Sequence, residues 1–158
     1  MLRFKERKRE VWGPGYSELF FLDEVTALAA GHRPCFECRR RDAEAFRGAF
    51  ADAVGVAHAA LSAEAIDERL HAERTRQDRT QALWASLPVG TLVETSQGVL
   101  AKAPHGAIGW SFGGYQSSYT PSGSDRIRLL TPPSTVAALR AGYRPSWHPS
   151  ASEGTHHG

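Results

Sequence analysis

Hydrophobic residues recur at helical spacing through the first half of the chain. The pattern predicts three helices, over residues 24–30, from about 39 or 41 to 54, and from 63 to about 76. In the second of these, Phe46, Phe50 and Val54 recur at intervals of four and mark one buried face. Asp23 is a good N-cap for the first, and Gly31 is well placed to end it. A weaker helical pattern covers residues 77–85.

The pattern changes after residue 88, where Gly, Ser and β-branched residues become frequent and acidic residues become rare. Short runs of alternating or β-branched residues predict strands over 91–95, 99–102, 107–112 and 126–130. Residues 113–124 are polar and are expected to form a loop. A last helix is expected to begin at Thr131, with Pro132 at its first position, and to end at Gly142.

Before the first helix, apolar residues flank a charged run and predict short strands near residues 2–4 and 11–12, followed by a strand over 16–22. We therefore predict an α+β fold: an N-terminal hairpin and metal-knuckle with helices, followed by a small antiparallel sheet and a C-terminal helix. The expected division places the knuckle and its helices in 1–88, the β-rich half in 89–149 and a disordered tail in 150–158.

The composition limits the classes of protein to consider. A chain of 158 residues has room for one compact domain, or one domain with a small module, and 41% hydrophobic residues argue against wholesale disorder. The formal net charge is only +2, which does not indicate nucleic-acid binding by bulk charge. No apolar run is long enough to span a membrane, so we expect a soluble cytoplasmic protein without a membrane partner.

One internal similarity stands out. Residues 25–36, VTALAAGHRPCF, resemble residues 136–147, VAALRAGYRPSW, with a constant offset of 111 residues. Both segments predict a short helix ended by glycine, then an Arg-Pro turn in which proline prevents the helix from resuming. Duplication and a shared way of ending a helix remain alternative explanations.

The two cysteines of the chain, Cys35 and Cys38, lie in the first of these turns. Their Cys-x-x-Cys spacing suits two thiolates on one tetrahedral zinc, ahead of a helix whose N-terminus favours the anionic form. Other residues must complete a four-ligand site, and we favour His71, which has Asp67 one turn earlier as a carboxylate to orient its ring. The alternatives are His32 and His148, with His58 and His105 as poorer choices. Inert thiols and a redox dithiol are the other interpretations of the pair.

Residues 19–38, LFFLDEVTALAAGHRPCFEC, resemble the end of the Ada-type zinc-binding module. In DNA-repair methyltransferases that module holds zinc with four cysteines and binds DNA. Cys35 and Cys38 match its second cysteine pair, whereas the first pair, with the methyl acceptor, has no counterpart here. The resemblance therefore implies a zinc knuckle without methyl transfer. It also suggests that the missing thiols would precede Met1 in a chain with an earlier start.

Arginines suggest a partner for such a knuckle. Arg33, Arg39, Arg40 and Arg41 surround the cysteine pair, and the planar guanidinium fork suits phosphate oxygens, so we consider nucleic-acid binding at these residues. The alternative is a solvated face of mixed charge. Aromatic residues of the β-rich half could stack on bases, although sheet packing explains their spacing better: Trp110, Phe112, Tyr115 and Tyr119.

An enzyme is the competing class. Zinc-dependent deaminases are similar in having Pro-Cys-x-x-Cys and His-x-Glu, here residues 34–38 and 71–73, although the order of the two motifs is reversed. That resemblance implies a zinc-dependent hydrolase in which Cys35, Cys38 and His71 hold zinc and Glu73 moves protons. Sequence alone favours the structural knuckle over this alternative.

Overall fold

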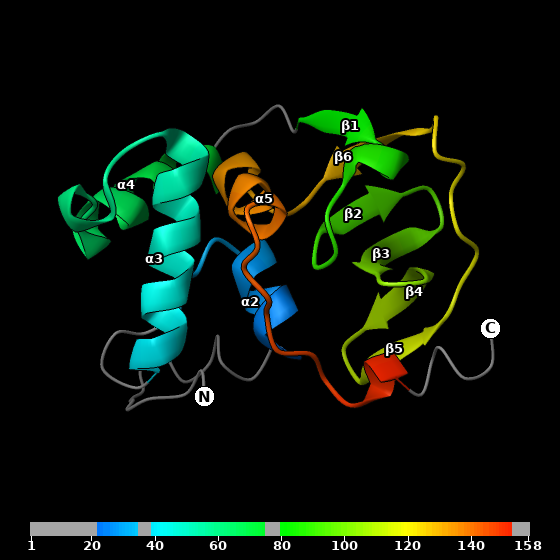
Figure 1. Ribbon diagram of the computed structural model, residues 1–158. Coiled ribbons are helices and arrows are strands. Elements are labelled where there is room, and N and C mark those ends of the chain that lie inside the picture. The colour runs from blue at the N-terminus through cyan, green and yellow to red at the C-terminus, as the bar shows by residue number, and fades with distance from the viewer. Residues whose placement is uncertain (1–21, 35–38, 75–79, 153–158) are drawn as a thin grey trace.

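The structure is a computed structural model that describes residues 22–34, 39–74 and 80–152. The strands expected before residue 22 and the pair Cys35 and Cys38 lie outside these ranges. The helices of the described residues are α2 (Glu24–Ala29), α3 (Arg40–Val54), α4 (Ala63–Arg74) and α5 (Pro133–Arg140), with short 3-10 turns at His58–Ala60 and Trp84–Ser86 (Figure 1). These are the four helices with strong sequence signals.

Six strands form one antiparallel sheet: β1 (Gln81–Leu83), β2 (Leu92–Thr95), β3 (Gly98–Ala103), β4 (Gly106–Ser111), β5 (Gly114–Ser117) and β6 (Arg126–Leu129). Their order across the sheet is β1-β6-β2-β3-β4-β5. The first and last of the predicted strands, β2 and β6, therefore lie side by side in the sheet. The α+β fold class is confirmed.

Two local predictions are wrong. Residues 81–83 form strand β1 rather than a helix, because they pair with β6 and because the Trp84 side chain that follows packs into the core of the sheet. Residues 114–117 form strand β5 rather than a loop, because they pair with β4 and bring Tyr115 opposite Trp110. In both places long-range pairing overrides a weak local preference.

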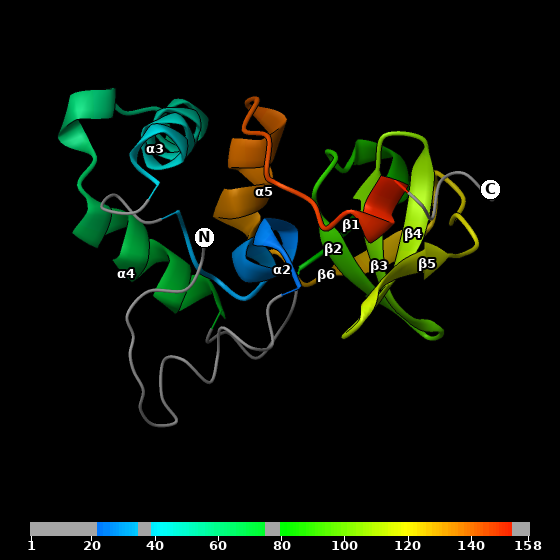
Figure 2. The same cartoon turned by 90° about the horizontal axis from the view of Figure 1, so that it is seen from below.

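The molecule has three layers, which Figure 2 shows most clearly. Helices α2 and α5 lie between the sheet and the outer helices α3 and α4. Val25 of α2 and Val136 of α5 join the apolar clusters of the sheet, whereas Leu28 and Leu139 of the same helices join the cluster of α3 and α4. The two middle helices thus belong to both cores.

The last described residues pack on the sheet. We expected residues 150–152 to belong to a disordered tail, but the Ser150 hydroxyl accepts a hydrogen bond from the Tyr115 amide at 2.7 Å and Ala151 packs against the sheet. This turn lies beside β5 (Figure 1). In the described part of the chain, no helix has the length and apolar character that crossing a membrane requires.

Candidate functional site around the first Gly-His-Arg-Pro corner

The two similar segments end their helices in the same way. After α2, the Gly31 amide donates to Leu28 O and the His32 amide to Ala27 O, both at 3.0 Å, and Gly31 has a φ of +94°. After α5, the equivalent pair of hydrogen bonds starts from Gly142, with φ +120°, and Tyr143. This is the glycine-dependent end known as the Schellman motif. The sequence similarity therefore has a structural counterpart, which either duplication or a shared way of ending a helix would produce.

The first corner is fixed to α4 by a two-pronged ion pair. The Arg33 guanidinium donates from Nε and Nη2 to the two carboxylate oxygens of Asp67, at 2.8 and 3.0 Å. The same side chain donates from Nη1 to Pro34 O at 3.0 Å. A two-pronged arginine–carboxylate pair fixes direction as well as distance. The corner that leads into the cysteine pair therefore lies against the middle of α4.

His71 lies one helical turn after Asp67 on α4 and has an exposed side chain. Residues four apart on a helix share a face, so His71 is on the face that receives Arg33. His32 is exposed in the corner itself. The ion pair between Arg33 and Asp67 thus places the corner that contains His32 against the helix that carries His71. Both cysteines lie outside the described residues.

The other histidine candidates lie elsewhere. The His148 ring accepts from or donates to the Ser150 hydroxyl at 2.8 Å beside the sheet. The His58 ring contacts Asp52 at 2.7 Å beside α3, and His105 is exposed in the turn between β3 and β4. Among the residues that the structure describes, no three His, Cys, Asp or Glu side chains form a group that could hold a metal ion.

Arg39, which follows Cys38, is part of a second cluster. Its Nη2 donates to Glu24 at 3.2 Å and to Asp42, and its Nε donates to Asp42 at 2.9 Å. Burial would lower the pKa of this guanidinium, but the charges and hydrogen bonds of Glu24 and Asp42 together raise it. The side chain therefore stays charged and ties the start of α3 to the start of α2.

The four candidate phosphate-binding arginines differ in availability. Arg33 and Arg39 are engaged by carboxylates, as described above. Arg40 contacts Glu44 at 3.8 Å and has a side chain that is 74% exposed, and Arg41 is exposed. Only the last two present their guanidinium groups to solvent.

Glu73 has a structural partner. Its side chain is only 8% exposed, and its carboxylate accepts hydrogen bonds from the Ser134 amide at 2.9 Å and from the Ser134 hydroxyl. Ser134 is the second residue of α5, so Glu73 satisfies one backbone donor and one hydroxyl donor at a helix N-terminus. Helix α5 starts at Pro133, one residue later than expected, and the Thr131 hydroxyl accepts from the Leu92 amide at 2.9 Å instead of capping the helix. Both oxygens of Glu73 thus have donors in α5.

The sequence did not reveal that the buried residues Asp23 and Glu24 form a hydrogen-bond network with distant parts of the chain. Besides capping α2 through Thr26, Asp23 accepts hydrogen bonds from the Tyr115 hydroxyl, at 3.0 and 3.1 Å, and from the His148 amide at 2.8 Å. Glu24 accepts from the Tyr143 hydroxyl and from the Ser146 amide, the latter at 2.7 Å. We call residues 143–148 the C-terminal strap. Of this network, the sequence predicted only the role of Asp23 as the N-cap of the first helix.

The two tyrosines of this network are held in the neutral form. Burial, followed by the nearby Asp23 carboxylate, raises the pKa of Tyr115 well above its usual value. Burial, followed by the hydrogen bond to Glu24, raises the pKa of Tyr143 in the same way. Each hydroxyl therefore remains a donor to its carboxylate at any physiological pH.

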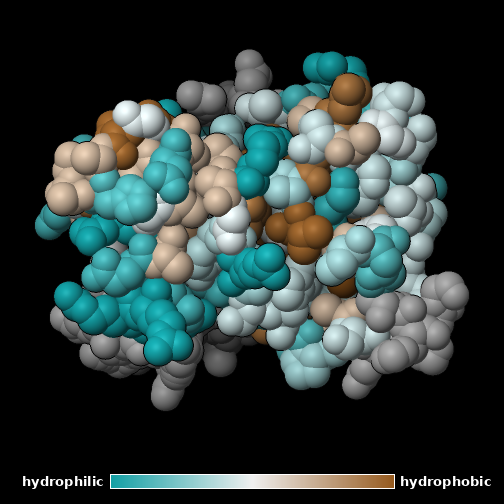
Figure 3. All heavy atoms as spheres, in the orientation of Figure 1, coloured by the Kyte–Doolittle hydropathy of each residue, from teal (hydrophilic) through white to brown (hydrophobic). Residues whose placement is uncertain are grey.

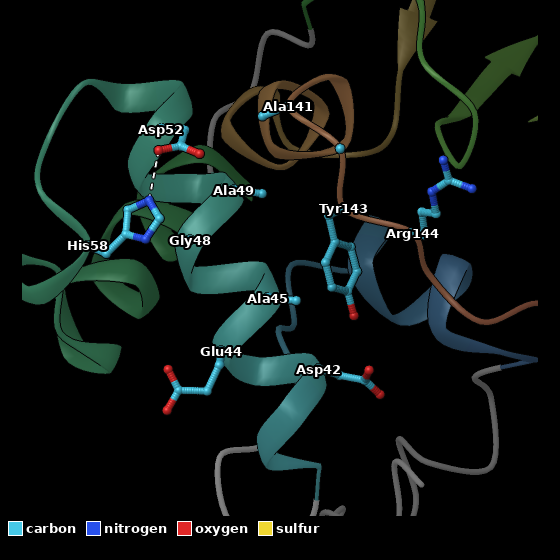
Figure 4. A pocket seen from close by; sticks show the side chains of 11 residues that line it. Asp42, Glu44, Ala45, Gly48, Ala49, Asp52, His58, Ala141, Tyr143 and Arg144 are labelled. Atoms are coloured by element: carbon cyan, nitrogen blue, oxygen red, sulfur yellow. Dashed lines mark hydrogen bonds and ion pairs between the residues drawn. The ribbon is translucent and has the colours of Figure 1, made fainter.

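A groove of about 520 Å³ runs along α3 beside the second corner. Figure 4 shows Asp42, Glu44 and Asp52 along α3, with the His58 ring turned toward Asp52. Gly48 makes room for that ring, since a Cβ there would come within 3.2 Å of His58 Cε1. The groove presents carboxylates without a nucleophilic serine, threonine or cysteine among its lining residues, so the His58–Asp52 pair has no hydroxyl or thiol to activate there.

The aromatic residues of the β-rich half divide into two kinds. Tyr115 is buried and hydrogen-bonded to Asp23, and the Trp110 indole donates to the Thr26 hydroxyl at 3.1 Å. Phe112, beside Trp110, and Tyr119 are exposed. The interior packing role is confirmed for Tyr115.

Comparison of this chain with protein-family models, with curated proteins and with solved structures gives no match.

Proposed function

We propose that the protein carries a structural zinc knuckle in which Cys35, Cys38 and His71 are ligands. The ion pair between Arg33 and Asp67 is the observation that carries this proposal. It holds the corner two residues before Cys35 against α4, one turn from His71. Arg39 supports the other side of the turn through Glu24 and Asp42.

The donor set suits zinc. Two thiolates and an imidazole are ligands that Zn²⁺ prefers, and a structural site closes with a fourth protein ligand. His32, exposed in the same corner, is the nearest of the candidate histidines along the chain to Cys35. We therefore propose His32 as the fourth ligand, in place of the more distant His148.

A structural role is favoured over the hydrolase alternative by the position of Glu73. A general acid or base must reach the reacting group. Here the carboxylate is buried against Ser134 at the start of α5. The knuckle would instead join the corner after α2, the start of α3 and the face of α4, and its metal would contribute folding free energy.

The test is the metal content of freshly purified protein. We expect stoichiometric zinc in the wild type, little in the Cys35→Ser/Cys38→Ser variant, and faster loss to a chelator in His71→Ala than in the matched control His105→Ala. Substitution with Co²⁺ should give the intense d–d bands of a tetrahedral site with thiolate charge-transfer absorption. Wild-type protein without zinc contradicts the knuckle, and equal zinc retention by His71→Ala and His105→Ala excludes His71.

For a nucleic-acid partner we propose Arg40 and Arg41 as the phosphate contacts, because these two guanidinium groups face solvent next to the knuckle. Replacing each with alanine should reduce the slope of log K against log salt concentration by about one unit. Arg126→Ala, on the sheet, is the control. An unchanged slope in the Arg40→Ala/Arg41→Ala variant excludes this partner at this surface.

A further inference from the structure

We infer that the second Gly-x-Arg-Pro corner forms a binding pocket for a small organic carboxylate with an apolar ring or chain, bound by Arg144. This site is separate from the proposed knuckle and does not depend on it. The pocket has a volume of about 540 Å³, which is within the range of small-molecule sites. It lies where α5, the C-terminal strap and the sheet meet.

The walls of the pocket are apolar. Leu139 of α5, Pro145 and Trp147 of the strap, Pro104 of the β3–β4 turn and Val89 of the loop before β2 line it. Figure 3 shows hydrophobic residues gathered in the middle of this face, in a hollow between hydrophilic ones. Such walls favour the apolar part of a ligand through burial of its surface.

Arg144 is the only charged residue among those that line the pocket. In Figure 4 its side chain points away from α3 and toward the loop before β2. Among the residues that the structure describes, Arg144 has no carboxylate partner, in contrast to Arg33 at the same position of the first corner, which binds Asp67. A guanidinium beside an apolar wall binds a carboxylate through two parallel hydrogen bonds. Charge complementarity thus selects an anionic ligand.

The pocket is preformed, because its walls are fixed from behind. Glu24 binds the Tyr143 hydroxyl and the Ser146 amide, and Asp23 binds the His148 amide, so the strap is anchored on both sides of Pro145 and Trp147. The Trp147 ring also lies 5.6 Å from the Tyr115 ring, measured between centroids. Because this wall does not have to become ordered when a ligand binds, less binding free energy is lost to ordering.

The facing loop is fixed as well. Gly90 has a φ of +104°, and its amide donates to Lys102 O at 2.9 Å. A Cβ at Gly90 would come within 3.1 Å of Pro145 Cγ and 3.2 Å of Leu139 Cδ2. Glycine therefore lets the loop that carries Val89 close on the strap and α5, and gives the pocket its third wall.

The two probes are naphthalene-2-acetate and its neutral analogue naphthalene-2-acetamide. Binding is measured by calorimetry and by the shift of the indole N–H resonance of Trp147. The Trp147→Phe variant assigns that resonance. We expect saturable binding of the acid, at least about tenfold tighter than the amide. Arg144→Ala should remove that preference, whereas Arg126→Ala, another exposed arginine, should retain it. Because Arg144 is exposed, its loss should leave the circular dichroism spectrum and the unfolding midpoint unchanged.

A second variant tests the pocket without touching Arg144. Val89 is 38% exposed, so Val89→Glu places a carboxylate at the pocket wall. Because like charges repel, this variant should weaken binding of the acid more than binding of the amide. Equal affinity for acid and amide, or no saturation at millimolar probe, overturns the inference. A wild-type dimer in sedimentation that dissociates on Arg144→Ala also overturns it, because a second copy of the chain would then be the occupant.

Discussion

Asp23 and Glu24 are neighbours in the chain, yet they bind different parts of the molecule. Asp23 receives donors from Thr26, Tyr115 and His148, and Glu24 receives donors from Arg39, Tyr143 and Ser146. Their residues are only 8% and 3% exposed. Buried carboxylates are tolerated where such donors surround them, so removing a single donor has a large effect.

Tyr143→Phe tests this dependence. The variant removes the hydroxyl that donates to Glu24 while it keeps the ring, which packs edge-on against Phe46. We expect the free energy of unfolding to fall by about 1–3 kcal/mol, measured by urea denaturation, because a buried carboxylate loses a donor. Tyr119→Phe, at an exposed ring, should change it by less than about 0.5 kcal/mol. Equal effects of the two variants would contradict the role of the Glu24 contact.

The same tyrosines predict an alkaline limit to stability. The pKa values of Tyr115 and Tyr143 are raised in the folded state, mainly by burial, above the value of about 10 in an unfolded chain. Above that pH the folded state binds more protons than the unfolded state, so the free energy of unfolding decreases. The stabilisation is fully present below pH ~10 and is lost as the pH rises further.

Denaturation of the wild type and of Tyr115→Phe/Tyr143→Phe between pH 8 and pH 11 measures this effect. The variant should be less stable than the wild type at the pH 8 end of this range and should lose less stability above pH ~10. Lys102, whose pKa burial lowers, is present in both proteins, so the difference between them isolates the tyrosines. Parallel profiles would show that neither hydroxyl titrates differently on unfolding.

At the scale of elements, the ends of α2 and α5 depend on glycine. Gly142 has a φ of +120°, and a Cβ there would meet no atom within 4 Å, so Gly142→Ala tests backbone strain alone. We expect a loss of about 1–3 kcal/mol in the free energy of unfolding. Gly113→Ala is the matched control, because that turn glycine has equal free space without a left-handed φ. Equal costs would exclude strain as the reason for glycine at this position.

The signals that the sequence carried well are local. Asp23 as the cap of α2 and the glycine ends of α2 and α5 depend on neighbours within a few residues. Strands β1 and β5 were missed because their pairing with β6 and β4, rather than their composition, makes them strands. Local pattern cannot supply that pairing.

In the candidate site, too, local features could be predicted from the sequence and long-range contacts could not. His71 and Asp67 were placed on one helix face by their spacing, but the arginine that binds Asp67 is 34 residues away. The donors that bind Asp23 and Glu24 from the strap lie 119 to 125 residues away. No periodicity spans such distances, so the strap, and the pocket that it forms, could not be predicted from the sequence.

At the scale of the whole molecule, the middle layer joins two cores. Leu28 of α2 packs with α3 and α4, whereas Val25 of the same helix packs with the sheet. Because the two cores share this apolar layer, unfolding of one core removes packing contacts from the other. We therefore expect the helices and the sheet to unfold together.

Leu28→Ala tests this coupling. The variant should lose about 2–5 kcal/mol in the free energy of unfolding, because the side chain is fully buried. Circular dichroism at 222 nm reports the helices. Tryptophan fluorescence, measured in a Trp12→Phe background, reports the sheet, since the other three tryptophans, Trp84, Trp110 and Trp147, pack there. The two probes should shift by the same amount and keep a common midpoint. Separate midpoints would show two independently stable parts.

The partnership between Glu24 and the strap also bears on how the chain is made. Translation delivers Glu24 first, while Tyr143 and Ser146 emerge more than a hundred residues later. Until the donors from later in the chain leave the ribosome, Asp23 has only the donors of Thr26 and Glu24 only that of Arg39, so burying the two carboxylates completely carries a cost. Helix α2 therefore reaches its final buried position only after the C-terminal strap has been synthesised.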